Sequence, residues 1–396
     1  MGFVRNHPCA LWIAMGLGAF ACGVVRAEAY RPTDDAEVLE RLPTPGAERR
    51  ELRALRDEVK ARPDRPALAM ALARRYLELG RTHSDPRYYG YAEAVLARWL
   101  RLPHPHPEAL VLRATVLQNR HEFQAALADL EEALRGNPRL AQAWLTRAAI
   151  QEVRGDYPAA LRSCLALAKL GASLTAAVCL ESALSLAGQL QSAYERLRGV
   201  VTESAGDEDD LLWARVTLAE MAERLDRPED AEHWYRAALA AGRRSPYLLA
   251  TYADFLLDRK RPADAISLLE KETHADPVLL RLTLAERQVN HPRCAGHTAM
   301  LKARFEASRA RGDMSHRGDE SRYTLHILHD PTTALKLALA NWSAQKEPRD
   351  ARLVLEAAHA AGQPEAAQPV KEFLERSGLE DARLERLLAD TGASGT

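Results

Sequence analysis

Alanine residues recur at intervals of 34 residues through the middle of this 396-residue chain. The pairs at this interval are Ala114 and Ala148, Ala126 and Ala160, Ala219 and Ala253, and Ala231 and Ala265. A fixed period of this length is typical of stacked helix–turn–helix units, each of which packs on its neighbours. Small residues suit such a stack because antiparallel helices approach closely only where the crossing side chains are small. The period predicts an all-α solenoid, an architecture that usually binds other proteins.

Each unit has two apolar stripes at helical spacing, as the segment 107–138 illustrates. Its stripes consist of Leu110, Ala114 and Leu117, and of Ala126, Leu130 and Ala133. A break near His121 separates them, and Pro138 ends the second. Residues recurring at positions i, i+3 or i+4 and i+7 lie on one face of a helix, so each stripe predicts one buried helix face.

The residues at fixed places in the next unit resemble those of the tetratricopeptide repeat. Trp144, Ala148, Gly155 and Ala160 match its large residue, its two small helix residues and its turn glycine. Further copies use Leu218, Ala219, Ala231, Tyr235 and Ala238, and then Tyr252, Ala253, Leu256, Ala265, Leu269 and Pro277. The resemblance is specific over 107–279 and implies a right-handed superhelix of helix–turn–helix units.

The chain as a whole resembles uncharacterised secreted bacterial proteins that contain tetratricopeptide repeats. The similarity lies in three short segments, 30–32, 85–91 and 341–348. This resemblance implies a fold and an exported location, but no activity.

The period also predicts how the chain is divided. We expect a signal peptide at 1–29, a partly helical lead segment at 30–65 and repeats at 66–279. Degenerate helical repeats with a closing helix are predicted at 280–390, followed by a disordered tail at 391–396.

The N-terminal segment has the pattern of a secretory signal. Arg5 precedes a stretch of 16 apolar or small residues, Ala10–Val25, which is short for a membrane span of about 20 residues. Small residues predict cleavage near Ala27 or Ala29. The mature protein is then expected in the periplasm without an integral membrane span. An uncleaved anchor is the alternative.

The charge balance argues against a nucleic-acid partner. The chain has 54 Lys and Arg residues against 55 Asp and Glu, a formal net charge of -1. A nucleic-acid site requires a basic stripe with a clear excess of positive charge. The expected partner is therefore a protein or a peptide.

By analogy with the repeat family, positions two, five, nine and twelve of each unit line the concave groove. These positions are Glu108, Val111, Thr115, Gln118, Gln142, Leu145, Ala149, Glu152, Trp213, Val216, Glu220, Glu223, Tyr247, Ala250, Asp254 and Leu257. The aromatic residues Trp213 and Tyr247 stand among acidic ones. Our hypothesis is a groove that holds a peptide of basic character through Glu220, Glu223 and Asp254. The alternative is that these acids are solvated surface residues.

A second candidate surface lies where a turn is predicted to extend from Thr82 to Gly90. It carries Arg87, Tyr88 and Tyr89, with Tyr91 directly after it. Loops on a rigid scaffold often bind partners, and Tyr and Arg are enriched at binding hot spots. The tyrosines could equally cap the first helix pair.

One histidine-rich segment is the basis of an alternative function. His291, Cys294 and His297 are spaced at intervals of three, and more histidines follow. These are His316, His326 and His329. Zinc takes four such ligands, so the alternative is a metal-handling protein that uses 291–329. Ordinary surface and turn histidines would give the same pattern. No other cofactor is predicted.

Cys164 and Cys179 are predicted on neighbouring helices, which makes a disulfide geometrically conceivable. We expect instead that they are small buried residues in alanine-like positions. The sequence contains no G-x-S-x-G, phosphate-binding glycine-rich loop or H-E-x-x-H motif. It therefore predicts a non-enzymatic periplasmic adaptor.

Overall fold

The computed structural model describes residues 46–171, 173–203, 207–312 and 317–393. In these residues it has twenty α-helices, one short 3-10 helix and no strand. The predicted signal peptide at 1–29 lies outside the described residues, as does the start of the lead segment. Among the described helices, none is both long enough and apolar enough to cross a membrane.

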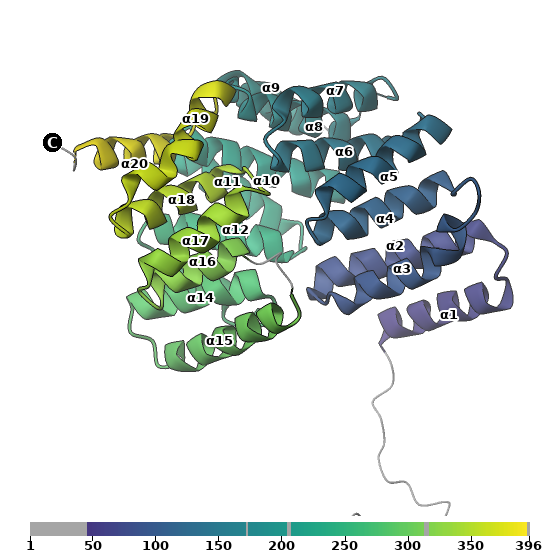
Figure 1. Cartoon of the computed structure of the whole chain (residues 1–396), viewed down its shortest axis with the longest axis horizontal. Helices are drawn as coiled ribbons and strands as arrows, with labels where there is room; N and C mark the ends of the chain where they lie inside the picture. The colour runs from purple at the N-terminus through teal and green to yellow at the C-terminus, as the bar shows by residue number, and fades with distance from the viewer. Residues whose placement is uncertain (1–45, 172, 204–206, 313–316, 394–396) are drawn as a thin grey trace, which may run out of the picture. The chain divides into compact units, whose positions relative to one another are not determined.

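Most helices form pairs joined by a short turn (Figure 1). The first pairs are α2 (Pro66–His83) with α3 (Arg87–Leu100), α4 (Pro107–Asn119) with α5 (Phe123–Gly136), and α6 (Ala141–Val153) with α7 (Tyr157–Ala168). They continue with α8 (Leu174–Leu186) and α9 (Leu190–Glu203), α10 (Glu208–Arg224) and α11 (Pro228–Ala240), and α12 (Pro246–Asp258) and α13 (Pro262–Leu269). The later pairs are α14 (Asp276–Gln288) with α15 (Cys294–Ala310), α16 (Arg317–His326) with α17 (Pro331–Trp342), and α18 (Pro348–Ala360) with η1 (Pro364–Ala367) and α19 (Gln368–Ser377). The remaining helices are α1 (Ala47–Ala61) and α20 (Ala382–Ala393).

The alanines of the 34-residue period lie at the helix crossings. All eight are buried, and none exposes more than 1% of its surface. Pro228 and Pro262 each begin the second helix of a pair, where a missing backbone N–H costs nothing. The predicted all-α helix–turn–helix solenoid is confirmed.

The long turn predicted from Thr82 to Gly90 is wrong. Helix α2 continues to His83 and α3 begins at Arg87, so three residues connect them. Gly80 lies inside α2 and leaves room for the ring of Tyr89, which a Cβ at that position would approach to 2.7 Å. Gly80 therefore allows α3 to pack closely on α2 and is not part of the turn.

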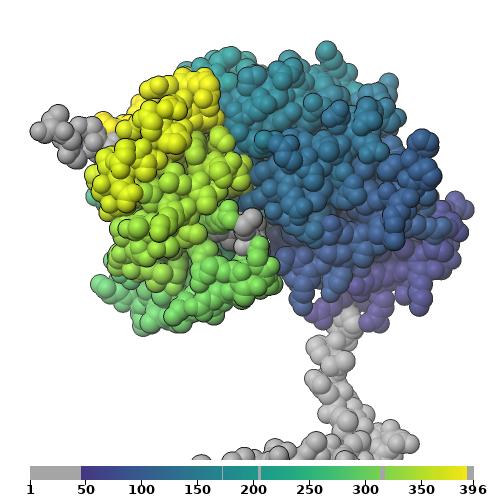
Figure 2. Space-filling view, viewed as in Figure 1, coloured from purple at the N-terminus to yellow at the C-terminus, as the bar shows by residue number. Residues whose placement is uncertain are grey.

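The C-terminal helices return to the central units and contact the turns within them. Gln345 lies 3.0 Å from the ring of His121, in the turn between α4 and α5. The backbone N–H of Lys346 donates to the carbonyl of Val153 at 2.7 Å, at the end of α6. In Figure 2 the surface of the last helices, in yellow, meets the teal surface of the central units.

The same contact continues along the next two turns. Phe373 of α19 packs beside Gly155, where a Cβ would come within 2.6 Å of its ring. The backbone of Gly378 lies against that of Gly188, in the turn between α8 and α9. We call Lys346, Phe373 and Gly378 the clasp. It joins the C-terminal units to the centre of the solenoid.

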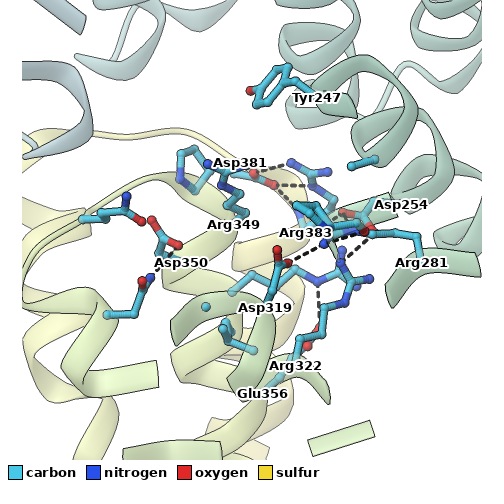
Figure 3. Close-up of a pocket in the computed structure, with 18 of the residues that line it drawn as sticks. Tyr247, Asp254, Arg281, Asp319, Arg322, Arg349, Asp350, Glu356, Asp381 and Arg383 are labelled. Carbon is cyan, nitrogen blue, oxygen red and sulfur yellow. Dashed lines mark hydrogen bonds and ion pairs between the residues drawn. The ribbon is translucent and has the colours of Figure 1, made fainter. Parts of the chain in front are cut away.

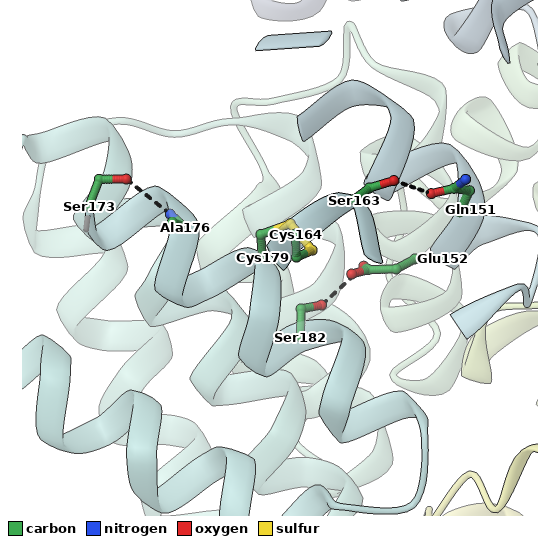
Figure 4. The surroundings of a disulfide bond; sticks show 8 residues. All are labelled: Gln151, Glu152, Ser163, Cys164, Ser173, Ala176, Cys179 and Ser182. Carbon is green, nitrogen blue, oxygen red and sulfur yellow. Dashed lines mark hydrogen bonds between the residues drawn. A yellow bond between two sulfur atoms is a disulfide. The ribbon is translucent and has the colours of Figure 1, made fainter. Parts of the chain in front are cut away.

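A disulfide bond links Cys164 of α7 to Cys179 of α8 (Figure 4). The expectation of two unbonded cysteines is therefore wrong. Both residues are buried, and their Cα atoms are 5.5 Å apart, a separation typical of disulfides. The two positions face each other because α7 and α8 pack directly together.

Removing this disulfide by the double substitution Cys164→Ala and Cys179→Ala is expected to lower the free energy of unfolding. The bond spans 15 residues, and a loop of that length is worth about 3 kcal/mol. Chemical denaturation of the oxidised protein and the double variant measures the difference. Cys294→Ala is the control, since Cys294 is free and partly exposed. Equal stabilities of the oxidised protein and the double variant would contradict the bond.

Candidate functional site

The concave side of the solenoid contains a pocket with two lobes between the central and C-terminal units. The small lobe has a volume of about 360 Å³ and the large lobe one of about 680 Å³. The residues that line both are Tyr247, Ala250, Asp254, Arg281, Pro348, Arg349 and Arg383. Figure 3 shows that charged side chains of the small lobe come from several helices that lie far apart in the sequence.

Many of the groove positions inferred by analogy line this pocket. Ten of the sixteen border the large lobe. They are Gln118, Ala149, Glu152, Trp213, Val216, Glu220, Glu223, Tyr247, Ala250 and Asp254. They lie on the first helices of four units, so these helices face one common space.

Asp254 lies between two arginines in this space. Arg281 donates to its carboxylate at 3.0 to 3.1 Å and Arg322 at 2.6 Å. Burial alone would raise the pKa of Asp254, but the two positive charges lower it to about 2. Arg281 also pairs with Asp319 (Figure 3). The carboxylate of Asp254 is thus held ionised by the chain itself.

Glu223 and Glu220 have partners of different kinds. Glu223 accepts from Tyr235 and, at 2.6 Å, from Arg383 of α20. Burial raises the pKa of Glu223 to about 7, although Arg383 opposes the shift. Glu220 accepts from the hydroxyl of Tyr247 at 2.5 Å, and burial raises its pKa as well. Of the three predicted acids, only Glu220 forms no direct ion pair with an arginine among the described residues; the charges of Arg349 and Arg224 act on it from farther away.

The pocket has more acidic than basic side chains. Its carboxyl groups are Glu152, Asp209, Glu220, Glu223, Asp254, Asp319, Glu347, Asp350, Glu356 and Asp381. Its guanidinium groups are Arg81, Arg224, Arg281, Arg322, Arg349, Arg352 and Arg383. Burial raises the pKa of Glu152 to about 8 and that of Asp350 to about 7. The carboxyl groups of Glu152 and Asp350 are therefore partly protonated, and thus neutral, near pH 7.

The aromatic residues near the first turn lie outside both lobes. Arg87 pairs with Asp85, while Tyr88 and Tyr91 lie 6.1 Å and 5.6 Å from the ring of Tyr76. Tyr89 packs on α2 as described above. All four predicted residues belong to α3; Tyr88 and Tyr89 pack against the core between α2 and α3, whereas Arg87 and Tyr91 remain exposed.

The predicted metal ligands point to other partners. His291 and His297 lie 3.5 Å and 2.8 Å from the carboxylate of Glu286, and the sulfur of Cys294 faces the carbonyl of Thr283. Within the described ranges, no group of three or more His, Cys, Asp or Glu residues could hold a metal ion.

The histidines farther along the chain, His326 and His329, contact different partners although they line one shallow pocket. His326 lies 3.4 Å from Glu356, whereas His329 contacts Arg287 on α14. His316 lies outside the described residues. The metal-handling alternative therefore has no support from the described part of the segment.

Paired helices, buried alanines at a 34-residue period and a concave pocket define this chain as a tetratricopeptide-type solenoid. No protein-family model matches it, and no curated protein does.

Three solved structures are similar in fold. A human IFIT1 dimer with PPP-AAAA has 13% identity and a TM-score of 0.49, covering 83% of this chain and 77% of that one. A Rap protein complexed with Competence and Sporulation Factor has 11% identity and a TM-score of 0.47, covering 87% and 97%. PilW, a type IV pilus biogenesis factor, has 17% identity and a TM-score of 0.40, covering 50% and 94%. Because these scores are below 0.5, the fold assignment rests on the chain's own helices.

Proposed function

We propose that this protein is a non-enzymatic scaffold that holds a segment of a partner protein in the large lobe. The supporting observation is that ten inferred concave positions border a single pocket, with Trp213 and Tyr247 among them. Tyr247 is 47% exposed although it is large and aromatic. Aromatic residues of this kind carry much of the binding energy at protein interfaces.

The size of the lobe limits what can enter it. Its volume of about 680 Å³ lies within the range of about 300–1,000 Å³ that is usual for ligand pockets. A short extended segment fits such a space, whereas a folded domain does not. The lobe therefore favours a loop or a terminal segment of the partner.

We also propose that the protein works outside the cytoplasm, in the periplasm. Structural disulfides persist mainly in oxidising compartments, and Cys164 and Cys179 are bonded. The apolar stretch Ala10–Val25 is consistent with export. Cell fractionation with N-terminal sequencing tests this location. A mature protein beginning near Glu28 or Tyr30 is expected, and a cytoplasmic full-length chain would contradict export.

Site-specific photocrosslinking tests the binding site. A benzophenone amino acid replaces Trp213 in the large lobe or, as the control, Leu165, which is 48% exposed on α7. We expect a discrete partner to be captured from position 213 and not from position 165. Mass spectrometry should place the crosslink in one short segment of that partner. The same products from both positions, or none from position 213, would refute the proposed site.

A further inference from the structure

Two serines on one face of α8 bring together charged side chains from the helices on either side. Ser182 donates to the carboxyl group of Glu152, from α6, at 3.1 Å (Figure 4). One turn later, Ser185 accepts from the guanidinium of Arg224, from α10, through its hydroxyl at 2.6 Å and its carbonyl at 3.1 Å. Since residues three apart lie on one helix face, Glu152 and Arg224 are neighbours in the large lobe.

Arg224 is a buried charge that forms no direct ion pair among the described residues, although the carboxylates of Asp381 and Glu220 lie near enough to favour its charged form. It is only 6% exposed, and within the described residues its hydrogen bonds reach only the neutral oxygens of Ser185. A guanidinium carries five N–H donors, more than these two bonds use. The lobe thus contains a cationic group that can bind an anion.

Glu152 and Glu220 are acids in the same lobe that form no direct ion pair among the described residues, although the charge of Arg224 acts on both. In the described part of the chain, Glu152 bonds to Ser182 and Glu220 to Tyr247. Glu220 lies one turn before Arg224 on α10, so both point from one face of that helix. Burial raises the pKa of both acids, and the nearby charge of Arg224 offsets this only in part.

The other charged residues of the large lobe are accounted for, apart from Arg81, which is exposed at its rim. The pairs are Asp209 with Arg243, Glu223 with Arg383, Asp254 with Arg281, and Glu347 with Arg349. In the part of the chain that the structure describes, the interior charged groups of the lobe without a direct ion pair are therefore one guanidinium and two carboxyl groups. Leu212, Trp213 and Val216 provide an apolar wall beside them.

We infer that Glu152, Glu220 and Arg224 form a site for a zwitterionic ligand that carries an ammonium and a carboxylate close together. The carboxylate pairs with the planar guanidinium of Arg224, a geometry that favours two parallel hydrogen bonds. The ammonium lies between Glu152 and Glu220, and an apolar substituent packs along Trp213. A free α-amino acid has this chemistry, and so do the two ends of a very short peptide. The site is a small-molecule site within the pocket and does not depend on capture of a partner protein.

Isothermal titration calorimetry of the mature, oxidised protein tests the site with L-leucine and L-phenylalanine. N-acetyl-L-leucine lacks the ammonium and L-leucinamide lacks the carboxylate, so each removes one charge. We expect either blocked form to bind at least about tenfold more weakly than leucine, because each loses a hydrogen-bonded charge pair. Leucyl-leucine distinguishes a site for free amino acids from a site for short peptides. If it binds more tightly than leucine does, the site is one for short peptides. If neither amino acid binds, or if blocked and free leucine bind alike, the inference is wrong.

Matched variants test which residue binds each charge of the ligand. In Glu152→Gln, leucine should bind no better than N-acetyl-leucine, and in Arg224→Gln no better than leucinamide. Glu195→Gln is the control, because Glu195 lies outside both lobes in a partly exposed pair with Arg227, and it should leave leucine binding unchanged. If Arg224→Gln fails to fold, leucine binding by Glu152→Gln and binding of the blocked ligands by the unsubstituted protein still test the site. Unchanged leucine binding by Glu152→Gln and Glu220→Gln would overturn the assignment.

Discussion

Replacing Phe373 with alanine is expected to lower the free energy of unfolding by about 3–5 kcal/mol, as for other buried phenylalanines. Phe373 is 3% exposed, and its ring lies 5.9 Å from Tyr157 and 5.2 Å from Trp342. The substitution leaves an empty volume between the C-terminal units and the central turn at Gly155. Denaturant unfolding followed by circular dichroism measures the loss.

A matched substitution distinguishes the effect of losing the clasp from the effect of losing any buried phenylalanine. Phe305 of α15 is equally buried, at 2%, and packs on Tyr323 away from the clasp. Phe305→Ala should cost similar stability, but only Phe373→Ala should speed amide hydrogen exchange at Lys346, whose N–H bonds to Val153. Equal exchange at Lys346 in both variants would mean that Phe373 does not hold the C-terminal units in place.

Replacing Asp254 with alanine is expected to cost about 3 kcal/mol, because it removes an ion-pair partner of both Arg281 and Arg322 and leaves the buried Arg281 with Asp319 alone. Arg281 is 6% exposed and shares Asp254 with Arg322. Asp209→Ala is the comparison, since the pair of Asp209 and Arg243 is more than half exposed and such pairs contribute about 0–1 kcal/mol. Similar losses in the two variants would contradict the role given to the buried ion pairs.

The stabilisation by Asp254 has a defined pH dependence. Its pKa is lowered from 3.8 to about 2 in the folded protein, so the folded state favours the ionised form. The contribution is complete above about pH 4 and is lost as the pH falls through 2. The stability difference between the protein and Asp254→Asn should therefore shrink between pH 4 and pH 2. A difference that stays constant over this interval would show that the charge of the Asp254 carboxylate does not stabilise the folded state.

The helix pairs could be predicted from the sequence because their signal is local and periodic. Alanine every 34 residues fixes which helix faces pack, and prolines such as Pro228 mark where second helices begin. The concave positions followed from the same register, which is why Glu152 and Trp213 could be assigned to one face. The long turn predicted at 82–90 is wrong because residues 87–91, which lie outside the periodic pattern, form the first turn of α3 and pack on α2 through Tyr89.

The clasp and the arginines of the pocket could not be predicted, since they join distant and degenerate units. Tyr157 and Lys346 are 189 residues apart, and Glu223 and Arg383 are 160 apart. No periodic pattern in α17 to α20 indicates which surface they contact. The bond between Cys164 and Cys179 was missed for another reason: the sequence places both on neighbouring helices but does not fix the direction of their side chains.

The central claim is that the C-terminal units close over the concave face and form the pocket. A distance distribution between spin labels at Arg162 of α7 and Glu375 of α19 tests it most directly. Both residues are exposed, and labels on genetically encoded amino acids leave the disulfide between Cys164 and Cys179 intact. The closed solenoid predicts one narrow distribution, which broadens towards longer distances in Phe373→Ala. A broad distribution that already extends to long distances in the unsubstituted protein would contradict closure and, with it, the pocket.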